Sequence, residues 1–367
     1  ISPVELGGAP FALTTDAAVE APAAELGLKI NGGGRIYILP CIAGHVGADT
    51  AGMILSEEPQ EQDQMTLLVD VGTNAEIVLG NRQRLLACSS PTGPAFEGAQ
   101  ISCGQRAATG AIERVRINPE TLEPRFKVIG SDLWSDEAGF SAAIESHGVT
   151  GICGSGIIEV VAEMYLAGIV TVDGIVDGDL ASRSRRIIQN DRTWSYLLYS
   201  PVSDGTANAA NDQAQIVVTQ NDIRQIQLAK AALYAGVKLL MDHIGTDRIE
   251  RIRLAGAFGS HISVQHAMVL GLIPDCVLGE VSSAGNAAGT GARIALLNSQ
   301  SRDVIETLVK NIEKIETALE PKFQDYFVDA MAFPNKTDPF PNLFSVVTRP
   351  EAKIVADNGG GRKRRRR

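Results

Sequence analysis

The sequence predicts an α/β protein built on a mixed β-sheet flanked by helices. Two observations support this fold class. The 367 residues are 44% hydrophobic and only 5% aromatic, but they include 37 glycines, which suits a chain with many tight strand-to-helix turns. Apolar segments of strand length also run repeatedly into glycine-rich stretches that open helical patterns. The length allows two or three domains, or one large two-lobed domain.

The net charge argues against one class of partner. The formal net charge is −10, and residues 362–367 are all basic, so the rest of the chain carries −16. An acidic body repels a phosphate backbone, so we do not expect nucleic-acid binding. We expect residues 346–367 to be a disordered basic tail, because glycines precede the basic run and nothing there can pack. The alternative is a weak electrostatic contact with an acidic partner.

The cysteines argue against a local metal site. None of the five is spaced as Cys-x-x-Cys, so neither zinc nor an iron–sulfur cluster is expected from local spacing. Each lies among small or apolar residues, so we expect reduced, partly buried thiols. No signal peptide and no bilayer-length apolar run are found, which predicts a cytoplasmic chain without a membrane. The chain opens without Met, which suggests a processed or truncated piece of something longer. The cysteines are Cys41, Cys88, Cys103, Cys153 and Cys276.

Residues 1–60 are predicted to form a connecting arm with one strand and one helix. The first 34 residues are rich in Pro, Ala and Gly and only weakly periodic. A short strand is expected over 35–40. A helix of small residues is expected over 44–55, where it can pack closely on another backbone.

The most informative segment is residues 67–79, in which an apolar strand runs into Asp70 and then into a second apolar strand. This order is typical of a phosphate-binding hairpin. Asp70 can reach a metal ion or a phosphate-bound water, and Gly72 lets the backbone approach an oxyanion. Thr73 and Asn74 can donate hydrogen bonds from the turn. The alternative is an ordinary hairpin, since these residue types all favour turns.

A third strand is expected over 85–88, and then a helix that begins near Gly93 and Pro94. Glu97 lies one turn inside that helix. We include Gly93 and Glu97 among the candidate nucleotide-binding residues. Two further strands are predicted around 111–117 and 126–129.

A second glycine motif, GICGSG at residues 151–156, opens an apolar helix over 157–167. A helix start with free N–H groups and a positive dipole end is a natural anion site. Gly154, Ser155 and Gly156 are therefore candidate nucleotide-binding residues. The alternative for the same residues is helix capping with close packing.

The next long helix has clear boundaries. Residues 219–222 form a capping box, with Asp in place of the usual Glu, and Gly245 ends the helix. Lys230 lies off its apolar stripe, which leaves either a solvated lysine or one that faces a ligand. Before this helix, 171–217 is expected to hold strands and exposed loops, with a flexible loop over 204–212.

A strand over 251–255 runs into Gly256, Ala257 and Gly259. Small residues there let a flat ring lie on the backbone, as at an adenine-binding edge, although any tight strand-to-helix turn needs the same residues. A third Gly/Ala loop at 283–291 is predicted to open a helix through residue 297.

The C-terminal part is predicted to close the fold. A charged amphipathic helix is expected over 303–319. Residues 323–331 are expected to add an edge strand or a helix. A Pro-rich segment over 334–341 follows.

Taken in order, these motifs resemble one half of the actin/sugar-kinase/Hsp70 ATPase superfamily (ASKHA). More closely, they resemble the C-terminal region of the reductive activators of corrinoid proteins, and the likeness covers almost the whole chain. It implies an actin-like (ribonuclease H-like) ATPase lobe over residues 61–345. The segments that carry it are YILPCIAGHVGAD (37–49), LVDVGTN (68–74), TGPAFEGA (92–99), GICGSG (151–156), LAGAFG (254–259) and GNAAGTG (285–291).

The resemblance also implies cofactors and roles. Such activators use ATP to drive the uphill reduction of inactive cob(II)alamin in a corrinoid methyl-transfer protein. The turn from Asp70 to Asn74 would be the second phosphate loop, with Asp70 as the catalytic carboxylate and the ligand of Mg²⁺. Gly256, Ala257 and Gly259 would line the adenosine. Asp49 would lie in a helix that faces the other lobe.

Two departures from the family pattern limit this prediction. Only one Asp-x-Gly-Thr strand is found, so the first lobe is incomplete or missing. The cysteine run of the family's N-terminal two-iron two-sulfur ferredoxin domain is absent too. We therefore expect the C-terminal piece of a longer redox ATPase, inactive alone.

Two other functions stay open from the sequence. A small-metabolite kinase would use Asp70 or Glu97 to position an acceptor group. A noncatalytic interaction module would keep the glycines for packing alone. The sequence also leaves a homodimer open.

Overall fold

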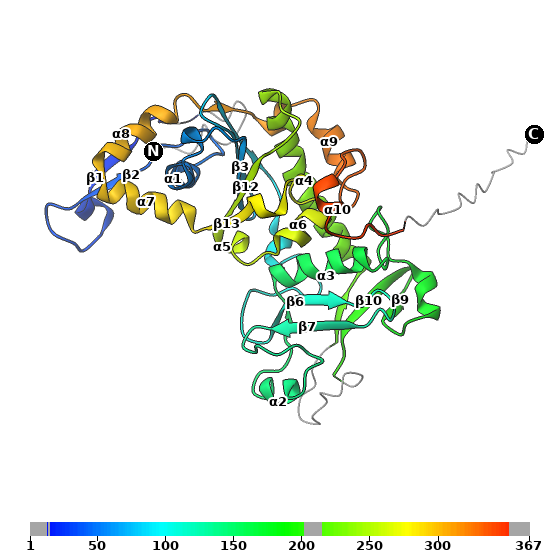
Figure 1. The fold of residues 1–367 in the computed structure, drawn as a ribbon. Helices are drawn as coiled ribbons and strands as arrows, with labels where there is room; N and C mark the ends of the chain where they lie inside the picture. Colours follow the sequence, from blue (N-terminus) through cyan, green and yellow to red (C-terminus); the bar gives the residue numbers. More distant parts are fainter. Residues whose placement is uncertain (1–12, 14, 202–214, 352–367) are drawn as a thin grey trace, which may run out of the picture.

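The computed structural model describes residues 13, 15–201 and 215–351. The loop expected over 204–212 and most of the basic tail lie outside these residues. The core is a six-stranded sheet in the order β13-β12-β3-β4-β5-β14 (Figure 1). Its strands are β3 (Thr66–Val71), β4 (Ala75–Gly80), β5 (Leu85–Ser90), β12 (Arg251–Ala255), β13 (Val281–Gly285) and β14 (Glu313–Lys314). The first three form an antiparallel meander and the other three pair in parallel, so the predicted mixed sheet is confirmed.

Helices cover both faces of this sheet because the side chains of its strands alternate between two apolar cores. Leu67 and Val69 point into a larger core that also takes α4, whereas Leu68 packs into a smaller core with α1. The helices of the small core are α1 (Ala48–Glu57), α7 (Ala287–Leu297) and α8 (Ser299–Leu308). The helices of the large core include α4 (Gln220–Ile244), α6 (Val264–Leu270), α9 (Phe323–Asp329) and α10 (Pro341–Phe344).

Residues 91–219, which we call the insertion lobe, leave the core after β5 and return at α4. Figure 1 shows this lobe below the core sheet, with α3 against α6. One small sheet has the order β7-β6-β8 and another the order β11-β10-β9. The strands are β6 (Ala111–Ile117), β7 (Pro124–Val128), β8 (Gly151–Ile152), β9 (Ile187–Asn190), β10 (Thr193–Tyr199) and β11 (Ile216–Val218). The helices are η4 (Pro94–Glu97), α2 (Phe140–Ala143), α3 (Gly154–Leu166) and η5 (Gly178–Ser182).

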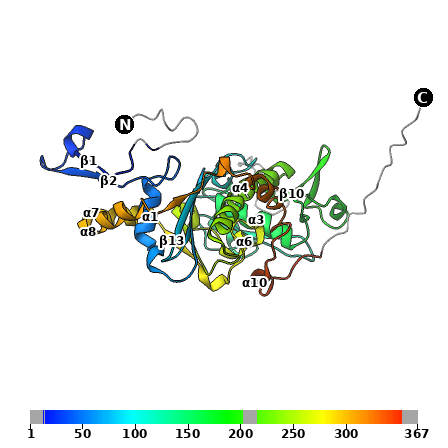
Figure 2. The same cartoon turned by 90° about the horizontal axis from the view of Figure 1, so that it is seen from above.

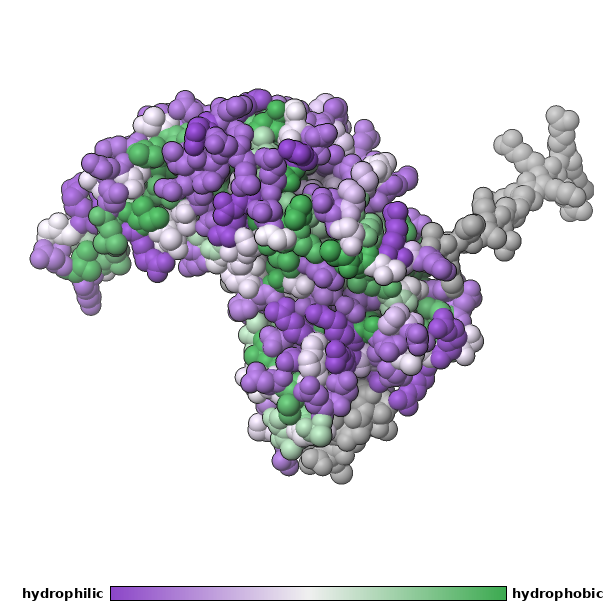
Figure 3. Space-filling view, in the orientation of Figure 1, coloured by the Kyte–Doolittle hydropathy of each residue, from purple (hydrophilic) through white to green (hydrophobic). Residues whose placement is uncertain are grey.

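The N-terminal arm is a hairpin of β1 (Val19–Pro22) and β2 (Arg35–Ile38). Seen from above, it lies at the same end of the molecule as α7 and α8 (Figure 2). Exposed apolar side chains gather where the arm meets these helices (Figure 3). They are Leu26, Leu28, Ile30, Ile38, Leu296 and Leu297. Short turns complete the fold: η2 (Ala23–Leu26), η3 (Pro59–Glu61), α5 (Gly256–Gly259), η6 (Leu278–Glu280) and η7 (Thr317–Leu319). In the described part of the chain no helix is long and apolar enough to cross a membrane.

Two predicted segments differ from the structure. Residues 281–285 are strand β13, so the helix after them begins only at Ala287, capped by the Asn286 side chain. The helix expected over 303–319 ends at Leu308, and the chain continues as β14. The cause is burial: Ile315 is 7% exposed and its amide donates to the carbonyl of Ala87 at 2.9 Å, which adds a sixth strand to the sheet.

The two ends of helix α4 are as predicted, but the environment of Lys230 on this helix is not. The Thr219 hydroxyl and the Asp222 carboxylate cap each other's backbone, and Gly245 ends the helix at φ +79°. Lys230, however, is fully buried and donates to the carbonyls of Ala332 and Pro334. Burial lowers the pKa of this amine well below its ordinary value. Both predicted readings of Lys230, solvated or facing a ligand, are therefore wrong, because it ties α4 to the C-terminal segment.

The small-residue helix α1 packs on α7 through two glycines. A Cβ placed on Gly291 would lie 1.9 Å from the carbonyl oxygen of Gly52, and one on Gly52 would lie 2.9 Å from that of Ala288. The two helix backbones are therefore in direct contact, as the small residues of 44–55 predict. The start of α1, and with it Asp49, is fixed by this crossing.

We predict that Gly291→Ala destabilises the chain by about 1–3 kcal/mol, the usual cost of overpacking. The added methyl group meets backbone, which cannot rotate away, so the helices must separate. Gly279→Ala is the matched control, since a Cβ there meets no atom within 4 Å. Urea unfolding of both variants measures the difference, and equal midpoints would contradict the close crossing.

Candidate functional site at the edge of the core sheet

Asp70 and Gly256 lie side by side where β3 and β12 end. Asp70 pairs with Ala255 across the two parallel strands, and Gly256 follows at φ +81°. A Cβ on Gly256 would lie 2.3 Å from Oδ1 of Asp70, so only glycine leaves this carboxylate room. The structure thus brings together the predicted phosphate-side carboxylate and the predicted adenosine edge.

The turn at residues 72–74 is tied to the start of the insertion lobe. The Thr73 hydroxyl donates to Oε1 of Glu97 at 2.7 Å, and the Gly93 amide donates to the Thr73 carbonyl at 2.9 Å. Thr73 and Asn74 are both exposed. Three predicted site residues, Thr73, Gly93 and Glu97, are therefore joined by hydrogen bonds, and Asn74 is the next residue of the turn.

Three carboxylates share the region beside the turn. Glu76 lies opposite Asp70 in the β3–β4 ladder, and Asp49 lies in the first turn of α1. Burial, and then the charge of Asp49, raises the pKa of Asp70. Burial, Asp49 and Asp70 in that order raise the pKa of Glu76 from 4.5 to about 7. Like charges held this close favour a bound proton or cation.

Sequence reasoning missed Glu76 as a site residue, although the signal was present. With a three-residue turn at 72–74, antiparallel pairing places residue 76 directly opposite residue 70. Both side chains therefore point to the same face of the sheet, toward α1.

The carboxylates alone do not form a closed metal site. Among the described residues, no group of three or more His, Cys, Asp or Glu side chains is placed to hold a metal ion. A Mg²⁺ ion keeps most of its ligands as water and phosphate oxygens and needs only one or two carboxylates from the protein. Asp70 fits that limited role, because it is only partly buried and lies beside an exposed turn.

A cavity of about 480 Å³ lies at the junction of the core and the insertion lobe. It is lined by Glu97, by Gly154 and Ser155 at the start of α3, and by His261 just beyond α5. Apolar side chains, among them Phe96 and Ile129, form other parts of its wall. The cavity therefore lies between the first turn of α3 and His261, two residues beyond α5, and Glu97 connects it to Thr73 of the phosphate turn. Gly256 and Gly259 do not line it.

Two of the predicted glycines have a packing role in the structure. A Cβ on Gly156 would lie 2.3 Å from the carbonyl oxygen of Ile112, and one on Gly259 would lie 2.9 Å from that of Leu254. Both glycines are buried. Their contact with a nucleotide stays a prediction, as does that of Ala257, whose side chain lies outside the described part of the chain.

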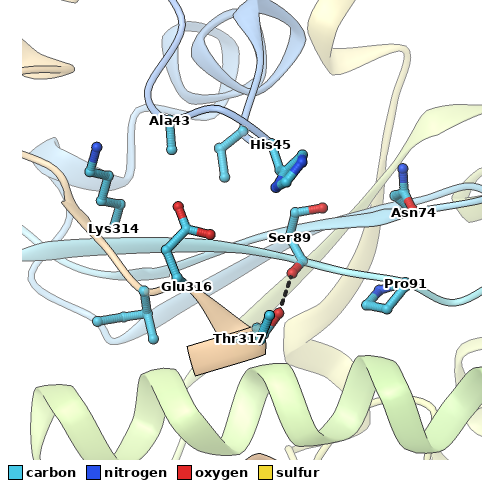
Figure 4. Close-up of a pocket in the computed structure, with 11 residues that line it drawn as sticks. Ala43, His45, Asn74, Ser89, Pro91, Lys314, Glu316 and Thr317 are labelled. Atoms are coloured by element: carbon cyan, nitrogen blue, oxygen red, sulfur yellow. Dashed lines mark hydrogen bonds between the residues drawn. The ribbon is translucent and has the colours of Figure 1, made fainter. Parts of the chain in front are cut away.

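Asn74 faces a second cavity of about 400 Å³ at the same edge, beyond β4. Figure 4 shows His45 and Glu316 pointing into it from opposite sides, with Asn74 at its rim. The Thr317 hydroxyl donates a hydrogen bond to the carbonyl of Ser89, which joins the 314–318 segment to the end of β5 at the wall of this cavity. Asn74 is thus separated from the junction cavity, which Glu97 and the first turn of α3 line.

A buried polar contact joins the insertion lobe to the core. Nε2 of His266 on α6 lies 2.8 Å from Oε1 of Glu163 on α3. Glu159, one turn earlier on α3, is fully buried and accepts from Arg114 at 2.9 Å and from Arg116. The contacts of Glu159 hold α3 on β6 within the insertion lobe, and the contact of Glu163 joins α3 to α6 of the core.

Comparison with protein families matches nearly the whole chain. A family model described as the C-terminal domain of RACo, the ASKHA domain, matches residues 64–344. A second model, described as the RACo middle region, matches residues 1–62. The first match alone covers more than half of the chain.

Individual relatives agree with the family models. The chain is 33% identical over 340 residues to the "Corrinoid activation enzyme RamQ" of Eubacterium limosum, covering 90% of this chain and 53% of that protein. It is 25% identical over 323 residues to a Methanosarcina barkeri reductase named for a "Co(II) methylated amine-specific corrinoid protein", covering 85% of this chain and 54% of that protein.

A solved structure shows the same fold. The "Reductive activator for corrinoid,iron-sulfur protein" superposes with a TM-score of 0.76 and 31% identity, covering 91% of this chain and 50% of that chain. The chain therefore spans about half the length of the relatives it matches.

We predict that Glu76→Gln removes a pH-dependent loss of stability. Between about pH 4.5 and pH 7 the folded state keeps a proton on Glu76 that the unfolded state has lost, so stability falls as pH rises through this window. The variant should have a higher melting temperature than the wild type at pH 8 and a similar one at pH 4.5. Thermal unfolding between pH 4.5 and pH 8 measures the melting temperatures, with Glu61→Gln at an exposed position as the control. If the melting temperatures of the wild type and Glu76→Gln changed in parallel with pH, the raised pKa of Glu76 would be rejected.

Proposed function

This chain belongs to the RACo family, whose C-terminal domain is an ASKHA domain, and we propose that it is the C-terminal ATPase-type region of a longer redox activator. The longer protein uses ATP to drive the reduction of inactive cob(II)alamin in a corrinoid methyl-transfer protein. The observation that carries the proposal is the sheet edge where Asp70, the 72–74 turn and Gly256 meet. Glu97, bound to Thr73, links this edge to the junction cavity.

The proposed nucleotide lies along this edge. Its base and ribose occupy the junction cavity, where Phe96 and Ile129 provide apolar wall. Its phosphates reach the 72–74 turn, whose backbone N–H groups face solvent beside Asp70. A cavity of about 480 Å³ is large enough for a nucleoside.

Asp70 is proposed to act through Mg²⁺ or water on the phosphates. Mg²⁺, when bound, neutralises the charge that develops on the transferred phosphoryl group. In this arrangement Asp70 would bind that ion directly or through a water, and the turn amides would donate hydrogen bonds to the phosphate oxygens. Burial is the larger cause of the raised pKa values of Asp70 and Glu76, and the charge of Asp49 adds to it; a bound cation offsets both effects.

ATP is proposed to drive electron transfer through a change in affinity. Binding of the nucleotide and closure over it change how tightly the activator holds one state of the corrinoid partner. Only a difference in affinity between two states can shift that equilibrium. The corrinoid partner belongs to the family proposal, as the names of the matched relatives indicate.

Two features support a longer protein. The chain spans half the length of its relatives, and an apolar surface is exposed where the arm meets α7 and α8. Contiguous exposed apolar residues usually mark an interface. The family's ferredoxin domain and its two-iron two-sulfur cluster are proposed to belong to the rest of that protein.

The family matches favour this reading over a small-metabolite kinase or a noncatalytic interaction module. The matched relatives are named as corrinoid activators and a corrinoid-protein reductase. A homodimer and a cytoplasmic location stay proposals.

In the longer parent protein, we predict that Asp70→Asn lowers ATP-dependent corrinoid reduction by about 100-fold or more, the usual cost of losing a group that supports charge in the transition state. Formation of cob(I)alamin, followed by absorbance, measures the rate. Asp63→Asn is the matched control, since the Asp63 side chain is 84% exposed. Unfolding midpoints check that both variants fold, and unchanged turnover in Asp70→Asn would reject the site.

We also predict that the 367-residue chain shows no iron–sulfur absorption in the visible region after reconstitution with iron and sulfide, whereas the longer parent does. Its cysteines are free and no described group of ligands can hold a metal. A stoichiometric cluster spectrum from the chain alone would overturn this division of cofactors.

A further inference from the structure

Residues 92 and 93, at the start of the insertion lobe, donate hydrogen bonds to the phosphate turn at residues 72–74. Thr92 is buried, and its hydroxyl lies 2.7 Å from the carbonyl oxygen of Gly72 and 3.1 Å from that of Thr73. The Gly93 amide adds a donor to the Thr73 carbonyl at 2.9 Å. Both carbonyls of the turn therefore point toward residues 92 and 93.

These hydrogen bonds to the two carbonyls determine the direction in which the amides of the turn point. In a planar trans peptide the C=O and the N–H point in opposite directions. The carbonyl of Gly72 shares its peptide with the N–H of Thr73, and the carbonyl of Thr73 shares its peptide with the N–H of Asn74. Drawing both carbonyls toward Thr92 therefore aims both N–H groups the other way.

These two N–H groups are available to a ligand. Within the described part of the chain neither the Thr73 nor the Asn74 amide donates a hydrogen bond. Both residues are exposed. Successive amides aimed at one side of a turn form a concave site for an anion.

We propose that Thr92 is the positioning residue of the phosphate site: its hydroxyl holds the 72–74 turn in the conformation that presents the Thr73 and Asn74 amides to a nucleotide's phosphate groups. The proposal rests on the proposed nucleotide site and adds a residue that the sequence motif contained but did not single out. Thr92 does not touch the nucleotide. It acts on the phosphates alone, through the backbone.

Glu97 and Thr92 both bind the turn, but a ligand can replace only the contact made by Glu97. Glu97 and Thr73 are both exposed, so a phosphate oxygen can replace Glu97 as the acceptor of the Thr73 hydroxyl. Thr92 is only 5% exposed. Among the described residues, the hydrogen-bond acceptors of its hydroxyl are the carbonyl oxygens of Gly72 and Thr73. Without that hydroxyl the Gly72 carbonyl loses its donor and the peptide is free to rotate.

The test compares nucleotides that differ only in phosphate. In the longer parent protein with Mg²⁺, calorimetry measures the Kd of ATP, ADP and adenosine for Thr92→Val and Thr92→Ser. Valine keeps the shape and removes the hydroxyl, whereas serine keeps the hydroxyl. We expect Thr92→Val to raise the Kd of ATP and ADP at least tenfold and to leave that of adenosine within twofold. Thr92→Ser should bind all three like the wild type.

Thr246→Val is the control, since the Thr246 hydroxyl also donates to a backbone carbonyl, that of Arg248, on an exposed turn remote from the site. Should Thr92→Val not fold, Thr92→Ala removes the same donor and gives the same comparison.

Each outcome decides the proposal. Wild-type affinity of Thr92→Val for ATP overturns it, as does an equal loss for ATP and adenosine, which would make Thr92 merely structural. A wild-type protein that binds none of the three ligands removes the proposed function itself. If the wild type binds the nucleotides and Thr92→Val binds them equally well, the proposed function stands and only the role of Thr92 is rejected.

Discussion

The site depends on one close approach, that of Gly256 to the carboxylate of Asp70. The parallel pairing of β3 with β12 places these residues at the same sheet edge, and any side chain at Gly256 would meet Oδ1 of Asp70. The positive φ of Gly256 turns the chain away just beyond the carboxylate. A partly open carboxylate next to an exposed turn follows from this geometry, and so does everything proposed for the nucleotide.

The site is built at a cost in stability. Asp70 and Glu76 are paired across one ladder. Burial, and then the charge of Asp49, makes ionisation of Asp70 less favourable, and burial, Asp49 and Asp70 do the same for Glu76. A structure selected for stability alone would place an apolar or neutral residue at position 76. Such strain is expected where function needs charge that a bound cation can neutralise. The buried contact of Glu163 with His266 differs, because there the carboxylate has a hydrogen-bonding partner and the contact joins two lobes.

The parts of the fold that the sequence predicted are those set by local contacts. The β3–β4 hairpin and the Thr219 capping box depend on residues a few positions apart. Long-range contacts decided the rest. Lys230 is buried because carbonyls about a hundred residues later accept hydrogen bonds from its amine. β14 is a strand because it pairs with the edge of β5. Neither partner is visible in a local pattern. At the site, the sequence indicated Asp70 and the turn, but Glu76 required the register and Thr92 required the turn's contacts.

The geometry of the turn explains why this chain alone is a poor candidate for a complete ATPase. The amides of Thr73 and Asn74 point from one surface into open space, and both residues are exposed. A triphosphate bound there keeps much of its charge in water, where interactions with protein dipoles are weak. Phosphoryl transfer needs a site closed to water. In the proposed longer protein, the covering surface belongs to the rest of the chain, and the exposed apolar residues of the arm beside α7 and α8 are its proposed attachment. The crossing of α1 on α7 at Gly52 and Gly291 packs the helix that carries Asp49 directly against α7, next to that apolar surface.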